Sequence, residues 1–203
     1  MLDARFKIVY QQYFLHHIAM NPVTQKLSPN HATFLSLLTG ISILPALYFS
    51  QPLLATILLL LSGYLDTLDG ALARLTGQTS PLGTVYDIMS DRAVECCIVL
   101  GLFSVDPAGR GVWALCMLCS MLICITSFLV VGIFAQNQSA KSFHYSPGLM
   151  ERAEAFIFFA LMIWLTDHFI PLAVLFSLLV SWTGWKRIRE FKLDQRRTLP
   201  ELS

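Results

Sequence analysis

Long runs of apolar residues dominate the pattern of this chain, and short polar or turn-forming stretches separate them. About 20 consecutive apolar residues suffice for a helix to cross the hydrocarbon core of a bilayer. The pattern therefore predicts an all-α integral membrane protein with six transmembrane helices. Their expected ranges are 32–50, 52–73, 84–105, 111–135, 150–166 and 171–185.

Local signals refine the first of these helices. Asn30 follows Ser28 and Pro29 and stands where an N-cap residue is expected, because its side chain can accept a hydrogen bond from a free backbone N–H. Pro45 lies inside the same helix and is expected to kink it, since proline lacks the N–H that the helix needs.

The segment before the first span, residues 1–27, has its own pattern. Apolar and aromatic side chains recur there at steps of three and four residues. This spacing predicts an amphipathic juxtamembrane helix in the membrane interface, and a packed cytoplasmic cap is the alternative. Residues 28–185 would then form the six-helix transmembrane domain, and residues 186–203 a basic cytoplasmic tail.

Composition agrees with a membrane protein. Of the 203 residues, 55% are hydrophobic and 13% are charged, whereas about 25% of the residues of a soluble domain are charged. We expect the lipid bilayer to surround the chain. The net charge of +1 gives no reason to expect a nucleic-acid partner.

The distribution of cations predicts the orientation. If the N-terminus is inside, thirteen of the fourteen lysines and arginines fall on the cytoplasmic side, and Arg110 falls on the other. Cytoplasmic segments of membrane proteins carry an excess of lysine and arginine. The sequence therefore predicts a multi-pass protein with both termini in the cytoplasm, in the inner membrane if the chain is bacterial.

The second predicted helix carries two acids near its cytoplasmic end. Asp66, Asp69, Gly70 and Ala73 are spaced i, i+3, i+4 and i+7. Residues at these spacings share one face of a helix. Glycine and alanine beside the carboxylates would leave room for a bulky ligand.

The third predicted helix carries two more acids near its cytoplasmic start. Gly83, Asp87 and Asp91 step by four and share a face, and a nine-residue connection, 75–83, joins the two helices. The four carboxylates are therefore expected to lie at similar depth, in a cavity open to the cytoplasm.

Four converging carboxylates repel one another, and each buried charge costs roughly 2.5–3.5 kcal/mol at the centre of a membrane helix. Arg74 and Arg92 can offset two charges at most. We expect two divalent cations, Mg²⁺ or Mn²⁺, since hard carboxylate oxygens suit such ions better than Zn²⁺. Two ions side by side are typical of displacement at phosphorus. Polar contacts between packed helices are the alternative explanation.

From residue 66 to residue 91 the chain reads D-x-x-D-G-x-x-A-R-(x8)-G-x-x-x-D-x-x-x-D. This pattern is similar in every fixed position to the signature of the CDP-alcohol phosphatidyltransferase family. The resemblance implies a six-helix, usually homodimeric enzyme of phospholipid biosynthesis. Such an enzyme transfers a phosphatidyl-type group from a CDP-linked lipid, such as CDP-diacylglycerol, to the hydroxyl of a polar alcohol and releases CMP.

The resemblance also implies roles for individual residues. Asp66, Asp69 and Asp87 would be metal ligands, and Asp91 would be both a ligand and the general base. The residues expected to border the CDP moiety are Asp66, Gly70, Ala73, Arg74 and Gly83, with Arg74 near the phosphates.

The acceptor alcohol is less constrained. Lys141 and Arg152 are the candidates for binding it, and "GLMERAEAF" resembles the E-R-x-E-R element of relatives that use inositol phosphate, with Ala155 in place of the second arginine. The sequence leaves the identity of the acceptor open among inositol phosphate, glycerol phosphate and another polyol. Arg152 could instead pair with a carboxylate, and Glu95 could bind the acceptor or pair with a polar group across a helix contact.

Two hypotheses from other classes compete with this one. A transporter of protons or divalent cations would explain acids inside a membrane, but it predicts acids spread across the depth of the bilayer. An intramembrane prenyl-diphosphate transferase would also use paired aspartates with Mg²⁺. It would not require the glycine, alanine and arginine at these spacings.

Overall fold

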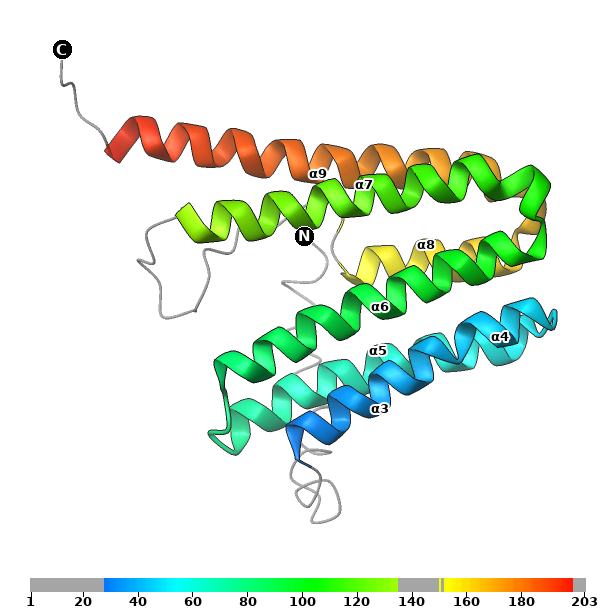
Figure 1. Ribbon diagram of the computed structural model, residues 1–203, viewed down its shortest axis with the longest axis horizontal. Helices are drawn as coiled ribbons and strands as arrows, with labels where there is room; N and C mark the ends of the chain where they lie inside the picture. Colours follow the sequence, from blue (N-terminus) through cyan, green and yellow to red (C-terminus); the bar gives the residue numbers. More distant parts are fainter. Residues whose placement is uncertain (1–27, 135–149, 151, 199–203) are drawn as a thin grey trace.

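The computed structural model describes residues 28–134, 150 and 152–198, and every regular element within these ranges is helical (Figure 1). The predicted N-terminal helix, residues 1–27, and Lys141 lie outside the described residues. The elements are α3 (Pro29–Ile41), α4 (Ile43–Tyr48), α5 (Pro52–Leu75), α6 (Pro81–Val105), α7 (Pro107–Phe134), α8 (Arg152–Trp164), the 3₁₀ helix η3 (Thr166–His168) and α9 (Phe169–Thr198).

Within the described ranges, four helical stretches are long and apolar enough to cross a membrane. They are Pro29–Tyr48, Pro52–Leu75, Pro107–Phe134 and Thr166–Gln195. The prediction of an all-α membrane protein is therefore confirmed, whereas the number six stays a prediction. The two remaining helices explain the difference, because α6 carries charges in its middle and α8 has only 13 residues.

Serine caps begin α3 and α6, and each serine is followed by proline. The cap of α3 is Ser28, whose side chain accepts from the backbone N–H of His31, so the expectation that Asn30 is the cap was wrong. Ser80 caps α6 in the same way, through the N–H of Gly83. Proline suits the first helical position because the N–H it lacks there has no partner in the helix.

The first span is interrupted near Pro45, as expected. Helix α3 ends at Ile41 and α4 begins at Ile43, with Ser42 between them. The Pro45 nitrogen cannot donate to the carbonyl of Ile41, and the ring clashes with that carbonyl. Helix α3 therefore ends four residues before the proline, at Ile41.

A tight turn brings the two acidic helices together. It covers residues 76–80, and is shorter than the expected nine-residue connection because α6 begins at Pro81. Gly77 has a positive φ of 65°, and the Gln78 N–H donates to the Ala73 carbonyl. A glycine in this conformation commonly ends a helix, since it has no Cβ to clash. The turn sets the end of α5 beside the start of α6.

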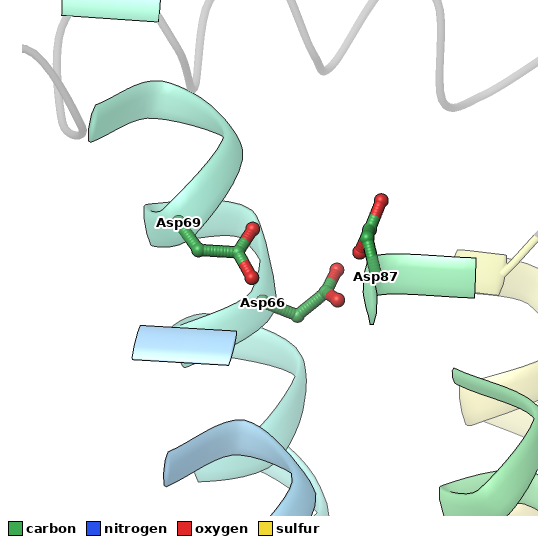
Figure 2. A group of neighbouring side chains, drawn as sticks. All are labelled: Asp66, Asp69 and Asp87. Atoms are coloured by element: carbon green, nitrogen blue, oxygen red, sulfur yellow. The ribbon is translucent and has the colours of Figure 1, made fainter. Parts of the chain in front are cut away.

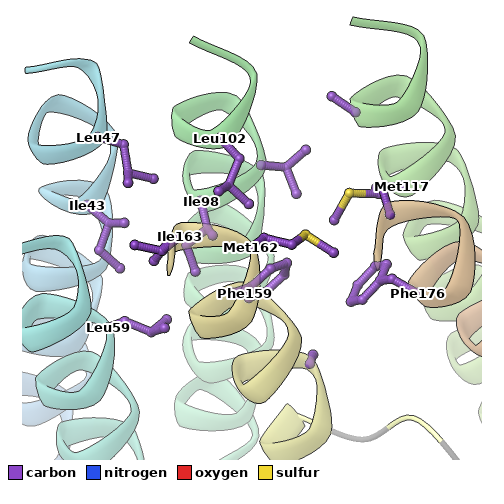
Figure 3. Close-up of a cluster of buried hydrophobic side chains, with 14 of the residues drawn as sticks. Ile43, Leu47, Leu59, Ile98, Leu102, Met117, Phe159, Met162, Ile163 and Phe176 are labelled. Atoms are coloured by element: carbon purple, nitrogen blue, oxygen red, sulfur yellow. The ribbon is translucent and has the colours of Figure 1, made fainter. Parts of the chain in front are cut away.

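The largest apolar core lies around α8, away from this turn. Phe159, Met162 and Ile163 of α8 are buried among residues of α4, α5, α6, α7 and α9 (Figure 3). The rings of Phe159 and Phe176 lie 5.5 Å apart, which joins α8 to α9. Because lipid is as apolar as these side chains, van der Waals packing rather than exclusion of water holds such a core.

Small residues let the helices around the core approach closely. Ser36 of α3 and Ser62 of α5 donate to each other's backbone carbonyls, both at 2.9 Å. A Cβ on Gly101 of α6 would lie 2.8 Å from Leu47 Cδ1 and 3.2 Å from Leu44 Cα. These contacts fix α3 and α4 against α5 and α6.

We therefore expect Gly101→Ala to lower the thermal midpoint of the purified protein in detergent. Alanine gains about 1 kcal/mol over glycine in a helix interior, but overpacking costs about 1–3 kcal/mol. Gly111→Ala is the matched control, since the nearest atom to its added Cβ lies 3.6 Å away. That variant should keep or raise the midpoint, and equal midpoints for the two variants would contradict the prediction.

Candidate active site

Three carboxylates meet where α5 and α6 face each other. Asp66 and Asp69 project from α5, and Asp87 projects toward them from α6 (Figure 2). One oxygen of each lies within 4.8 Å of the others. The shared helix faces that the sequence predicted thus converge on one point.

A third helix fixes the orientation of one of these carboxylates. Thr33 of α3 donates its hydroxyl to Asp69 Oδ2 at 2.5 Å, and both residues are buried. The Ser36–Ser62 contact one turn further along α3 holds the two helices at this distance. One oxygen of Asp69 also belongs to the group of three carboxylates.

Asp91 lies one turn further along α6 and is not in the group of three. Its Oδ1 contacts Arg152 Nη1, and the same nitrogen lies 2.5 Å from Asp66 Oδ1. Arg92 adds a longer contact, with Nη2 3.7 Å from Asp91 Oδ2. Arg152 of α8 therefore bridges the acidic faces of α5 and α6.

This bridge agrees with the alternative that the sequence left open for Arg152, an ion pair with a neighbouring helix. Glu95 shows a different partner from those expected. It is buried and pairs with Arg92 of its own helix, with 2.5 Å between Arg92 Nη1 and Glu95 Oε2.

A pocket of about 170 Å³ opens beside the carboxylates, on the side of the α5–α6 turn. A Cβ on Gly70 would lie 3.4 Å from Arg74 Nη1, and one on Gly83 would lie 3.1 Å from Ser80 Oγ, so both glycines widen this space. The lining residues are Pro29, Asn30, Thr33, Asp69, Gly70, Ala73, Arg74, Gln78, Thr79, Ser80, Gly83, Thr84 and Asp87.

The donor set fits a hard divalent cation. Three carboxylates supply oxygen ligands of the type that Mg²⁺ and Mn²⁺ prefer. Arg152 lies beside one of the three, with Nη1 2.5 Å from Asp66 Oδ1. Three carboxylates so close together carry more negative charge than one arginine offsets, and a divalent cation would neutralise the excess.

The family model for CDP-alcohol phosphatidyltransferases matches residues 26–185. The chain belongs to this family. It is an enzyme of that class, which decides against the transporter and the prenyl-diphosphate transferase. Archaetidylinositol phosphate synthase of Pyrococcus horikoshii is 29% identical over 181 residues, which cover 88% of this chain and 90% of the relative. Inner membrane protein YnjF of Escherichia coli is 28% identical, over 80% of this chain and 82% of the relative.

A solved structure has the same fold. Phosphatidylinositol phosphate synthase of Mycobacterium tuberculosis superposes with a TM-score of 0.70 at 20% identity, over 88% of this chain and 93% of that chain. One crystal structure of that protein has CDP-DAG bound, and another is a complex with manganese and citrate.

The structure brings together most of the residues that the sequence singled out. The pocket and the carboxylate cluster together contain Asp66, Asp69, Asp87 and the four residues expected to border CDP: Gly70, Ala73, Arg74 and Gly83. The sequence analysis missed Thr33. Its signal was present, because Thr33, Ser36 and Gly40 form a stripe of small residues on one face of the first span.

We expect Thr33→Val to reduce CMP release at least tenfold. Valine keeps the volume but removes the donor to Asp69. We expect Asp69 to be a metal ligand, and changing a residue that orients such a ligand typically costs 10- to 100-fold. Thr39→Val is the matched control, because the Thr39 hydroxyl donates only to carbonyls of its own helix. Wild-type rates in both variants would show that Thr33 does not orient the carboxylate.

Proposed function

We propose that this enzyme transfers a phosphatidyl-type group from a CDP-linked lipid to a phosphorylated polyol and releases CMP. The observation that carries the proposal is the group of three carboxylates beside a glycine-lined pocket with an arginine at its rim. The sequence signature over residues 66–91 contains these three carboxylates, the pocket glycines and Arg74. The solved relative with CDP-DAG bound supports a CDP-linked donor.

Asp66, Asp69 and Asp87 would hold divalent metal, and Asp91 would join them. Two cations, Mg²⁺ or Mn²⁺, would neutralise the diphosphate of the donor and the charge on the departing CMP. Arg74 lines the pocket and would bind a phosphate oxygen. The relative crystallised with manganese supports a metal of this class.

We propose Asp91 as the general base. The acceptor oxygen would attack the lipid-bearing phosphorus, the bond from that phosphorus to the CMP oxygen would break, and the acceptor proton would pass to the Asp91 carboxylate. Arg152 contacts Asp91 and also Asp66 of the carboxylate cluster, so Asp91 lies beside both the cluster and this arginine. An acceptor held at Arg152 would therefore present its hydroxyl to this base.

Arg152 favours a phosphorylated acceptor. Its guanidinium is mostly buried among carboxylates, and Nη1 makes the contacts to them, so the other N–H groups of its planar fork suit a phosphate. The archaetidylinositol phosphate synthase relative points to inositol phosphate. Lys141 is proposed as a second phosphate ligand from the sequence alone.

The remaining features of the proposal concern the membrane. We propose six spans, both termini and the active site on the cytoplasmic side, and a homodimer. A donor that is half lipid and an acceptor that is soluble can meet only at the interface. The carboxylates lie about two to three turns from the α5–α6 turn, at a depth that suits this meeting.

We expect Asp91→Asn to abolish CMP release from CDP-diacylglycerol and inositol phosphate, with the thermal midpoint kept near that of the wild type. A chelator should stop the wild-type enzyme, and Mg²⁺ or Mn²⁺ should restore it. Asp167→Asn, in η3, is the control and should keep full activity. Turnover by the Asp91 variant, or turnover without metal, would exclude the mechanism.

We expect Arg152→Gln to lower the preference for inositol phosphate over inositol at least tenfold, measured as the ratio of their kcat/KM values. Arg92→Gln removes the same charge from beside Asp91 and serves as the control, because Arg92 is engaged with Glu95. Its rate can fall, but the acceptor ratio should stay unchanged. An unchanged ratio in the Arg152 variant would place the phosphate elsewhere.

A further inference from the structure

We propose that the C-terminal half of α9 carries a binding surface for the headgroups of anionic phospholipids in the bilayer. The surface consists of Trp182, Trp185, Arg189 and Lys192, called here the outward stripe. All four side chains are exposed. Nothing in the catalytic site uses them.

The spacing of the stripe places it on one side of the helix. Its residues are separated by three, four and three positions, so they stack on a single face. The opposite face packs against α7, where Thr183 and Gly184 are buried and Arg187 donates to the Cys124 carbonyl at 3.1 Å. The stripe therefore points away from the bundle.

Composition changes along this face in the order expected for a helix that leaves a membrane. Exposed Leu175 and Leu178 precede the two tryptophans, and the cations follow them. The tryptophan rings lie 5.0 Å apart, and the Arg189 guanidinium lies 5.5 Å from the centre of the Trp185 ring. Tryptophan concentrates at the level of the headgroups, and cations beyond it attract anionic lipid.

The length of α9 also places its tryptophans and cations near the membrane surface. From Phe169, where α9 begins, to Arg189 the helix rises about 30 Å, which is the thickness of the hydrocarbon core. The polar 3₁₀ turn that contains Asp167 and His168 would then lie at the far surface, and the Arg189 guanidinium at the near one.

The charges of this half of α9 are sorted by face. Glu190 and Asp194 are four residues apart and lie on another side of the helix from the stripe. Lys186 borders the stripe, but its charge is offset by a pair, with Nζ 3.5 Å from Glu190 Oε1. The outward stripe thus presents cations without a carboxylate among them, which complements lipid phosphates.

The experiment compares matched single variants of the full chain in a neutral detergent. Native mass spectrometry would count phosphatidylglycerol and phosphatidylcholine bound from an equimolar mixture. We expect Arg189→Gln and Lys192→Gln each to lower the bound ratio about fivefold, the effect of one cation near an anionic surface. Lys186→Gln removes the same charge from a lysine that is paired with Glu190, and it should keep the ratio.

Two outcomes would overturn the proposal. The first is an equal ratio in the Arg189, Lys192 and Lys186 variants, because a general charge effect would then explain the binding. The second is a change of oligomeric state in Trp182→Ala/Trp185→Ala, measured by light scattering, because the stripe would then contact a second copy of the chain. Circular dichroism and the thermal midpoint show whether each variant remains folded.

Discussion

The repulsion among carboxylates inside a membrane bundle is the constraint on which the rest of this structure depends. Oxygens of Asp66, Asp69 and Asp87 lie within 4.8 Å of one another in helices that are otherwise largely apolar. Membrane insertion alone disfavours each such charge by roughly 2.5–3.5 kcal/mol at the bilayer centre. Arg152 reaches only one of the three, which leaves an excess of negative charge for cations. The excess negative charge thus has two consequences: it destabilises the bundle, and it gives the site its affinity for cations.

The fold holds this unfavourable cluster by means that lie around it. The Gly77 turn and the Ser80 cap set the start of α6 against the end of α5, and Thr33 orients a carboxylate from α3. The large apolar core lies elsewhere, around Phe159 of α8. Packing far from the acids therefore stabilises the bundle, while short polar contacts and tight turns determine the geometry of the site.

Features that depend on nearby residues could be predicted from the sequence, whereas contacts between residues far apart in the sequence could not. The acidic faces were predictable because they depend only on helical spacing, and the family signature uses the same residues. The partner of Asp91 was not, because Arg152 is 61 positions away and its approach depends on how α8 packs. The cap at Ser28 was missed for a local reason, since Asn30 is an equally good capping residue and only the position of Pro29 at the first helical site decides between them. The helical course of α9 to Thr198 continues past the predicted end of the sixth span near residue 185, because Ile188, Phe191 and Leu193 are interrupted by charges and indicate no membrane span.

The catalytic site and the outward stripe are linked by depth. The C-terminal half of α9 and the α5–α6 turn lie at the same end of the bundle (Figure 1). A helix held at the headgroup level by tryptophans and cations resists movement along the membrane normal, because the hydrocarbon excludes its charges and water disfavours its aromatic rings. Since α9 packs along α7, and α7 contacts α6, that restraint is transmitted to the helix that carries Asp87 and Asp91. In the proposed function the carboxylates meet a lipid-linked diphosphate and a soluble acceptor, and the outward stripe would help to set the depth at which they do so.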